Sequence, residues 1–87
     1  MYRIEYDRDA LKVLARMPAD QRRLIRAKVE RLAADPRGPN PQAKPLSGPL
    51  AGLFRLRVGD WRVVYHLDHA ATLVRVTVVK PRGGAYD

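Results

Sequence analysis

Three arginines on a short predicted hairpin are the residues of this chain best suited to chemistry. Apolar and basic side chains alternate up to Gly59-Asp60, and an aromatic and β-branched run follows. Gly59-Asp60 is a two-residue loop of the kind that joins antiparallel strands and sets their register. That register places Arg57 opposite Arg62, with Arg55 on the same face. The other face carries the side chains expected in the core, namely Phe54, Leu56, Val58, Trp61, Val63 and Tyr65.

This arginine face predicts a site for a polyanion. Like charges directly opposite one another destabilise a sheet, and no carboxylate lies between Arg57 and Arg62 because Asp60 occupies the loop. Replacing either arginine by alanine is therefore expected to keep or slightly raise stability. Guanidinium groups bind phosphodiester oxygens in bidentate fashion. The alternative interpretation is a solvated outer strand face on a basic protein.

Few other residues suggest chemistry. His66 falls on the arginine face and His69 in a turn, and two histidines without cysteine predict no metal site. No phosphate-binding glycine loop and no serine, histidine and aspartate arrangement appears. The tail holds a second cluster, Lys80, Arg82 and Tyr86, which can fold back over the arginine face. Neighbouring cations then favour the ionised form of the Tyr86 hydroxyl, whereas the alternative is a frayed terminus.

Composition restricts the class of partner. The 87 residues predict a single domain, 1–87, with a net charge of +8 and a pI of about 10.6. Arginine supplies 13 of the 17 basic residues, which favours phosphate contacts over a diffuse lysine coat. Nucleic acid, an acidic protein or an anionic surface are the partners expected. With no cysteine, no signal peptide and no apolar run of membrane-spanning length, we expect a cytoplasmic protein without a membrane partner.

The elements that position these residues follow from periodicity. Residues 2–6 alternate as a strand, and a helix capped by Asp7 or Asp9 then runs to Pro18. A second helix begins near Ala19-Asp20, with Asp20 as its expected cap. Residues 35–49 hold five prolines and predict neither helix nor interior strand. After the hairpin and a turn at 68–71, residues 72–80 form an interior strand with Val74, Val76 and Val78 on one face.

The predicted order is therefore β-α-α-β-β-β. A helical pair packed on one face of a small, mainly antiparallel sheet gives a two-layer α+β domain. The other face stays open and carries the arginines.

The whole chain resembles the RelE/ParE superfamily of bacterial toxins, and its RelE branch in particular. The resemblance rests on residues 2–6 with Ala10-Leu11, residues 44–48, residues 52–65, and a basic terminal segment ending in Tyr86. It implies a RelE-like domain acting as the toxin of a type II toxin–antitoxin system. RelE-type toxins are ribosome-dependent endoribonucleases that cut mRNA in the A site, each neutralised by a cognate antitoxin.

The resemblance implies a catalytic set and a reaction. Arg57, Arg62, Arg82 and Tyr86 are the expected catalytic residues, and Lys44, Arg55 and Lys80 are expected to bind RNA. Tyr86 would help a 2′-OH attack the adjacent phosphate, and arginines would stabilise the developing charge. No metal or cofactor is expected. The expected partners are an acidic antitoxin, forming a hetero-oligomer, together with the ribosome and mRNA.

Two other functions stay open. The ParE branch, which inhibits DNA gyrase, shares the fold but generally lacks this arginine and tyrosine set. A catalytically weak toxin-fold binding module is the third class. The chain also departs from the family's usual tail, since Val79-Lys80-Pro81-Arg82 stands where Gly-His-Arg or Gly-Lys-Arg is common, and Gly83-Gly84 precedes Tyr86.

Overall fold

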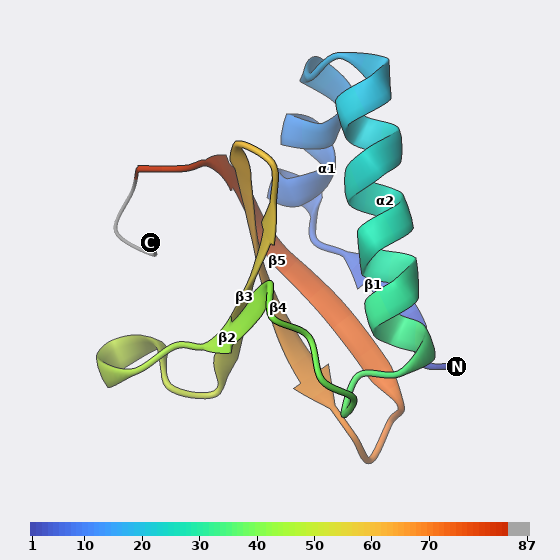
Figure 1. Ribbon diagram of the computed structural model, residues 1–87, viewed down its shortest axis with the longest axis vertical. Helices are drawn as coiled ribbons and strands as arrows, with labels where there is room; N and C mark the ends of the chain where they lie inside the picture. Colours follow the sequence, from blue (N-terminus) through green and yellow to red (C-terminus); the bar gives the residue numbers. More distant parts are fainter. Residues whose placement is uncertain (84–87) are drawn as a thin grey trace.

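Two helices cover one face of a five-stranded sheet in the computed structural model, which describes residues 1–83 (Figure 1). Tyr86 therefore lies outside the described residues. The elements in chain order are β1 (Arg3–Tyr6), α1 (Arg8–Arg16), α2 (Ala19–Ala34), β2 (Ala43–Pro45), a 3₁₀ turn η1 (Gly48–Leu50), β3 (Leu53–Val58), β4 (Trp61–Asp68) and β5 (Leu73–Pro81).

The sheet has the order β1-β5-β4-β3-β2. Only β1 and β5 run parallel, and the remaining neighbours are antiparallel. This confirms the predicted two-layer α+β class and the interior position of β5. Within residues 1–83, no helix has the length and apolar character that a membrane crossing needs.

The helices follow their apolar stripes. Ala10 and Leu14 of α1 are buried, as are Ile25, Val29, Leu32 and Ala33 of α2. Pro18 separates the two helices as expected, and Asp7 is the N-cap residue of α1. The expected cap of α2 is wrong: Pro18 takes that position, its carbonyl accepting from the Gln21 and Arg22 amides. Asp20 lies inside the first turn, where its charge still complements the helix dipole.

The hairpin of β3 and β4 has the predicted register. Val58 pairs with Trp61, Arg57 with Arg62 and Phe54 with Tyr65. Gly59 has a φ of 56°, the left-handed value that a tight hairpin loop requires at its first position. The apolar face packs into the core as expected, with Phe54 and Trp61 at its margin. Trp61 Nε1 also donates to Gln21 Oε1 at 2.9 Å, which ties the hairpin to α2.

One buried tyrosine anchors the centre of this core. Tyr65 is 1% exposed and stacks on Phe54 with ring centroids 5.5 Å apart. Burial raises the pKa of Tyr65 to about 12, because the charged phenolate is poorly solvated there. Its hydroxyl therefore stays neutral at physiological pH and adds no charge to the core.

The proline-rich segment holds more structure than its composition predicts. β2 pairs with β3 at the edge of the sheet, Lys44 opposite Arg55 and Pro45 opposite Phe54. An edge strand tolerates proline because only one side of its backbone must bond to a neighbour. The prediction of no helix in this segment is also wrong for η1, a single turn that begins at Gly48 with a φ of 64°.

A bulge changes which valines of β5 face the core. The register between β4 and β5 shifts between Val64 and Tyr65, so Val64 pairs with Val78 whereas Tyr65 pairs with Val76. The extra residue, Thr77, donates from its hydroxyl to the Val64 carbonyl at 3.2 Å. The core valines are therefore Val74, Val76 and Val79, and Val78 shares the opposite face with Val64. The expected alternation fails at Val78 because a bulge reverses the side on which later residues point.

The hairpin loop gives the first testable prediction. Gly59→Ala should destabilise the protein by about 1–2 kcal/mol, because a Cβ is strained at a left-handed φ. Asp60→Ala in the same loop is the matched control and should change stability by less than about 0.5 kcal/mol. Urea unfolding followed by tryptophan fluorescence measures both. Equal midpoints for the two variants would contradict the assigned loop geometry.

Candidate functional site

The register aligns cations in rows across the sheet face that the helices leave uncovered. Arg57 on β3 lies opposite Arg62 on β4, and Arg62 lies opposite Lys80 on β5. The next row holds Lys44 on β2 opposite Arg55 on β3, and it continues into Val64 and Val78. We call the five basic residues of the two rows, Lys44, Arg55, Arg57, Arg62 and Lys80, the cationic face.

The centre of the cationic face is less exposed than a solvated strand surface. Arg55 is 7% exposed and Arg62 is 5% exposed, whereas Lys44 and Arg57 are exposed. The open face expected from the sequence is thus recessed at these two arginines. Arginine is rarely buried to this degree without a partner. This recess weighs against the interpretation of a merely solvated strand face.

The two buried guanidinium groups have different surroundings. Arg62 donates from one terminal nitrogen to the Trp61 carbonyl at 3.1 Å and, more weakly, to the Gly59 carbonyl at 3.4 Å. Arg62 is thereby held against the hairpin loop. Arg55 Nε is buried and finds no acceptor within residues 1–83. A buried donor without an acceptor carries a desolvation cost that a bound anion relieves.

Arg82 lies at the loop end of the cationic face. Its amide donates to the Asp60 carbonyl at 2.9 Å, and its Nε is 3.8 Å from Asp60 Oδ1. These contacts hold Arg82, the residue that follows β5, beside the hairpin loop. Both side chains are exposed, so the ion pair itself contributes little to stability. The structure thus places the other predicted cations in the two rows of the cationic face and Arg82 at its loop end, and Tyr86 lies outside the described residues.

The two histidines lie in different parts of the molecule. His66 is exposed at the far end of β4, on the same side of the sheet as Arg62. His69 Nδ1 lies 2.8 Å from the Tyr2 hydroxyl in the turn before β5. In the part of the chain that the structure describes, no three histidine or acidic side chains gather closely enough to hold a metal ion.

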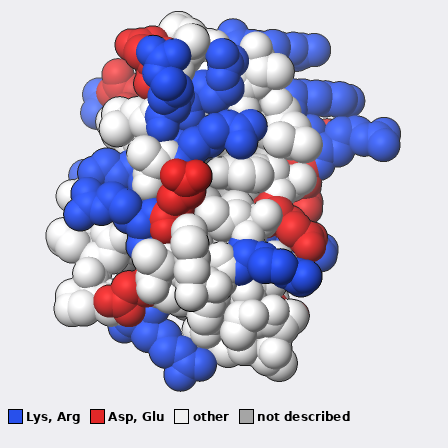
Figure 2. Space-filling view, turned by 90° about the vertical axis from the view of Figure 1, so that its right-hand side faces the viewer, with Lys and Arg blue, Asp and Glu red and all other residues white. Residues whose placement is uncertain are grey.

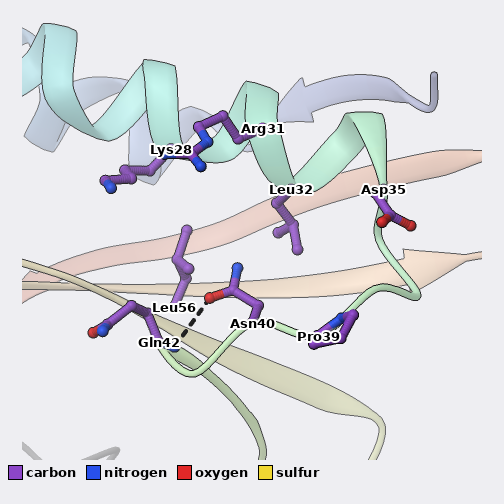
Figure 3. A pocket seen from close by; sticks show the side chains of 8 residues that line it. All are labelled: Lys28, Arg31, Leu32, Asp35, Pro39, Asn40, Gln42 and Leu56. Carbon is purple, nitrogen blue, oxygen red and sulfur yellow. Dashed lines mark hydrogen bonds between the residues drawn. The ribbon is translucent and has the colours of Figure 1, made fainter.

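A second basic region lies on the helical side and away from the cationic face. Figure 2 views that side and shows many Lys and Arg side chains with acidic groups among them. A pocket of about 340 Å³ opens between α2 and the segment before β2 (Figure 3). Its lining includes Lys28, Arg31 and Leu32 of α2 and Asp35 just after the helix. The backbone amide of Gln42 donates to Asn40 Oδ1. Sequence reasoning did not find this pocket, because residues 39–42 form it through an irregular path.

The contrast between Arg57 and Arg62 generates a stability prediction that corrects the expectation for Arg62. Arg62→Ala should destabilise the protein by about 1.5–3 kcal/mol, since it removes charge-assisted hydrogen bonds from a buried group. Arg57→Ala should change stability by no more than about 0.5 kcal/mol, since Arg57 is exposed. Thermal unfolding of this matched pair provides the measurement. A fall of equal size in both variants would show that burial does not distinguish them.

A known protein family resembles this chain over nearly its whole length. The family model described as the ParE toxin of the type II toxin–antitoxin system parDE matches residues 4–86. No curated protein sequence matches the chain.

Solved structures resemble the whole fold. The toxin–antitoxin complex RelBE2 from Mycobacterium tuberculosis contains a chain with 30% identity and a TM-score of 0.72, over 93% of this chain and 98% of that one. The archaeal RelE–RelB complex from Pyrococcus horikoshii gives 27% identity and a TM-score of 0.78, over 97% and 98%. The isolated E. coli RelE toxin, at 20% identity, shares the fold with a TM-score of 0.78 over 98% and 88%. The chain therefore belongs to the ParE toxin family of type II toxin–antitoxin systems, within the RelE/ParE superfamily.

Proposed function

We propose that this toxin is a ribosome-dependent endoribonuclease that cleaves mRNA in the A site without a metal ion or another cofactor. The observation that carries the proposal is the row of Arg57, Arg62 and Lys80, beside the buried Arg55 whose Nε has no acceptor within residues 1–83. An RNA backbone carries one anionic phosphate per nucleotide, so it can contact several cations of this face. A site that binds phosphate and excludes water around it strengthens each charge contact.

The proposed reaction is transesterification. The 2′-oxygen forms a bond to the adjacent phosphorus while the bond from phosphorus to the 5′-oxygen breaks. Tyr86 helps remove the 2′-OH proton, and Arg82 or Arg62 assists the leaving 5′-oxygen as it gains a proton. The products are a 2′,3′-cyclic phosphate, or the 3′-phosphate from its hydrolysis, and a 5′-OH end.

The cations have two different roles in this scheme. Arg57 and Arg62 stabilise the charge that develops on the phosphoryl oxygens, and removing one such preorganised donor costs roughly 2.7–4 kcal/mol of activation free energy. Lys44, Arg55 and Lys80 hold the backbone on either side of the reacting phosphate. Because Arg62 is fixed by the Trp61 carbonyl, its guanidinium needs little reorganisation when substrate arrives.

A second candidate function is inhibition of DNA gyrase in the manner of ParE. The observation in its favour is that the matching family model is that of the ParE toxin. A catalytically weak binding module, which pairs with an antitoxin without cleaving RNA, is the third candidate. The side chains of the cationic face favour the nuclease, because gyrase inhibition requires no preorganised phosphate site.

The three candidates separate in two assays on the purified toxin. A translating extract with 5′-end mapping of the mRNA detects A-site cleavage, and a supercoiling assay with purified gyrase detects gyrase inhibition. We expect cleavage of the mRNA in the first assay and no inhibition of gyrase in the second. Arg57→Ala should abolish cleavage, whereas the matched control Arg23→Ala on the exposed side of α2 should retain it. Gyrase inhibition without cleavage would overturn the proposal in favour of the ParE activity, and neither activity would favour the binding module.

Tyr86 gives the sharpest prediction for the chemical step. Tyr86→Phe keeps the ring and removes only the hydroxyl, so single-turnover cleavage on programmed ribosomes should slow by about 10²–10⁴-fold. Ribosome binding should change little, because it rests on many phosphate contacts. Cleavage close to the wild-type rate would reduce Tyr86 to a stacking residue and leave the chemistry to Arg62, Lys80 and Arg82.

The antitoxin is the remaining proposed partner. The solved relatives include the toxin–antitoxin complex RelBE2 from Mycobacterium tuberculosis and the RelE–RelB complex from Pyrococcus horikoshii. We propose that the toxin acts in the cytoplasm and that an acidic antitoxin, complementary to its net charge of +8, folds over the cationic face in a hetero-oligomer. Co-expression with an acidic protein from the adjacent reading frame should yield a complex and abolish growth arrest. Growth arrest that persists despite a stable complex would mean that the partner leaves the cationic face uncovered.

A further inference from the structure

The face that carries the cations continues along β4 into a region of opposite charge. Successive outward residues of β4 are Arg62, Val64, His66 and Asp68. At the acidic end the surface is hollowed into a pocket of about 420 Å³, within the range of small-ligand sites. We call it the distal pocket; it is lined by Asp7, Leu53, His66, Asp68, Leu73, Arg75 and Thr77.

Strand pairing ties the distal pocket to the cationic face. His66 lies between Leu53 on β3 and Arg75 on β5, and Asp68 lies opposite Leu73. His66 follows Arg62 by four residues, which places the pocket about 13 Å along the strand from the cationic row. A short stretch of extended RNA spans this distance. A strand held at its phosphate by Arg57 and Arg62 can therefore place a neighbouring base, outside the cleaved bond, in the pocket.

The polar groups of the pocket suit a base and repel a phosphate. Asp68 Oδ1 accepts from the Ala71 amide at 3.0 Å, and this bond orients the carboxylate. Asp68 Oδ2 has no partner among the residues described, 1–83, so it remains available to a donor. Arg75 lies 3.5 Å from Glu5 in an exposed ion pair, and Glu5 is also 4.0 Å from Arg3. The pocket thus offers an oriented carboxylate, and the one Lys or Arg in its lining, Arg75, already has an ion-pair partner.

The walls of the pocket suit a planar ring. Leu73 is 6% exposed and provides an apolar wall, with Leu53 opposite His66 in the same row. His66 is exposed and presents a ring on which a base can stack, as single-stranded RNA bases do on aromatic side chains. Thr77 lies in the β-bulge, where its hydroxyl donates to the Val64 carbonyl. Bulges beside a site commonly redirect side chains in this way.

We infer that the distal pocket is a base-recognition subsite that selects guanine in the RNA flanking the cleaved bond. Guanine presents two adjacent N–H donors, N1–H and N2–H, to one carboxylate, and Asp68 has the lone pairs to accept both. Adenine places an acceptor nitrogen against the same carboxylate and is disfavoured, and uracil offers only one donor. As a specificity site for the RNA substrate, this inference rests on the proposed nuclease function.

The variant that tests it is Asp68→Asn. Asparagine keeps the carbonyl Oδ1 that accepts from Ala71, so the turn should remain intact, but it replaces Oδ2 by an amide donor. Wild-type toxin acting on mRNAs with randomised bases around a fixed cleavage site should prefer guanine at one flanking position by about tenfold, the order expected for a bidentate base contact. Asp68→Asn should lose that preference, and the control Asp20→Asn on α2 should keep it.

A direct binding measurement separates failure of this inference from failure of the nuclease proposal. Titration with guanosine monophosphate, followed by amide chemical shifts in NMR, should perturb His66 and Asp68 in wild type and in Asp20→Asn. The same shifts should be absent with adenosine monophosphate and in Asp68→Asn. If wild type cleaves no transcript but binds the guanine nucleotide here, only the nuclease proposal fails. Cleavage without a flanking preference that depends on Asp68, or equal shifts with both nucleotides, overturns the subsite, and His66→Ala provides a second variant should Asp68→Asn not fold.

Discussion

The pairing of Arg57 with Arg62 is the constraint on which the candidate site depends. A two-residue loop at Gly59-Asp60 permits only one register between β3 and β4, and that register sets two guanidinium groups opposite one another. The pairing of β4 with β5 then adds Lys80 to the same row. Apolar side chains on the other face pack into the core and prevent the strands from slipping by one residue. The core therefore stabilises an arrangement of like charges that the surface alone would disfavour.

Such an arrangement links the proposed substrate to the proposed partner. Like charges opposite each other in a sheet lower stability, and each anion that binds between them relieves the repulsion. A phosphodiester and a carboxylate can both do this, so our proposals imply that RNA and an acidic antitoxin compete for the same cationic face. The recessed Arg55 adds a buried donor that either anion can satisfy. Under these proposals the toxin needs no separate inhibitory site, because an antitoxin on the cationic face would exclude RNA.

Most of the fold could be predicted because its strongest signals are local. The hairpin register follows from the loop and the alternation around it, and the helices follow from their apolar stripes and Pro18. The features that were missed depend on contacts distant in sequence. β2 exists because β3 offers it a partner, despite Pro45, and the bulge at Thr77 arises only when β5 pairs with β4.

The candidate site shows the same difference between local signals and contacts distant in sequence. Which cations share a face follows from the period of a strand, so Arg55, Arg57 and Arg62 could be grouped from the sequence alone. How deeply each is buried depends on the packing of the whole sheet, and the near-complete burial of Arg62 leads us to predict a loss of stability on its removal that the sequence did not suggest. The distal pocket could not be predicted because its residues come from β3, β4, β5 and the start of α1, and no single segment carries its pattern.

The change of charge along β4 bears on which branch of the superfamily the chain represents. The same fold carries RelE and ParE toxins, so the fold alone does not decide between cleaving RNA and acting on gyrase. A binding surface for a protein needs complementary shape and charge but no particular order of groups along one strand. A nuclease that holds a phosphate and reads a nearby base needs cations at one point and acceptors a few residues further on. The outward residues of β4, from Arg62 through Val64 and His66 to Asp68, have that order. This sequence of chemical groups, more than the total charge, favours RNA as the ligand of the sheet.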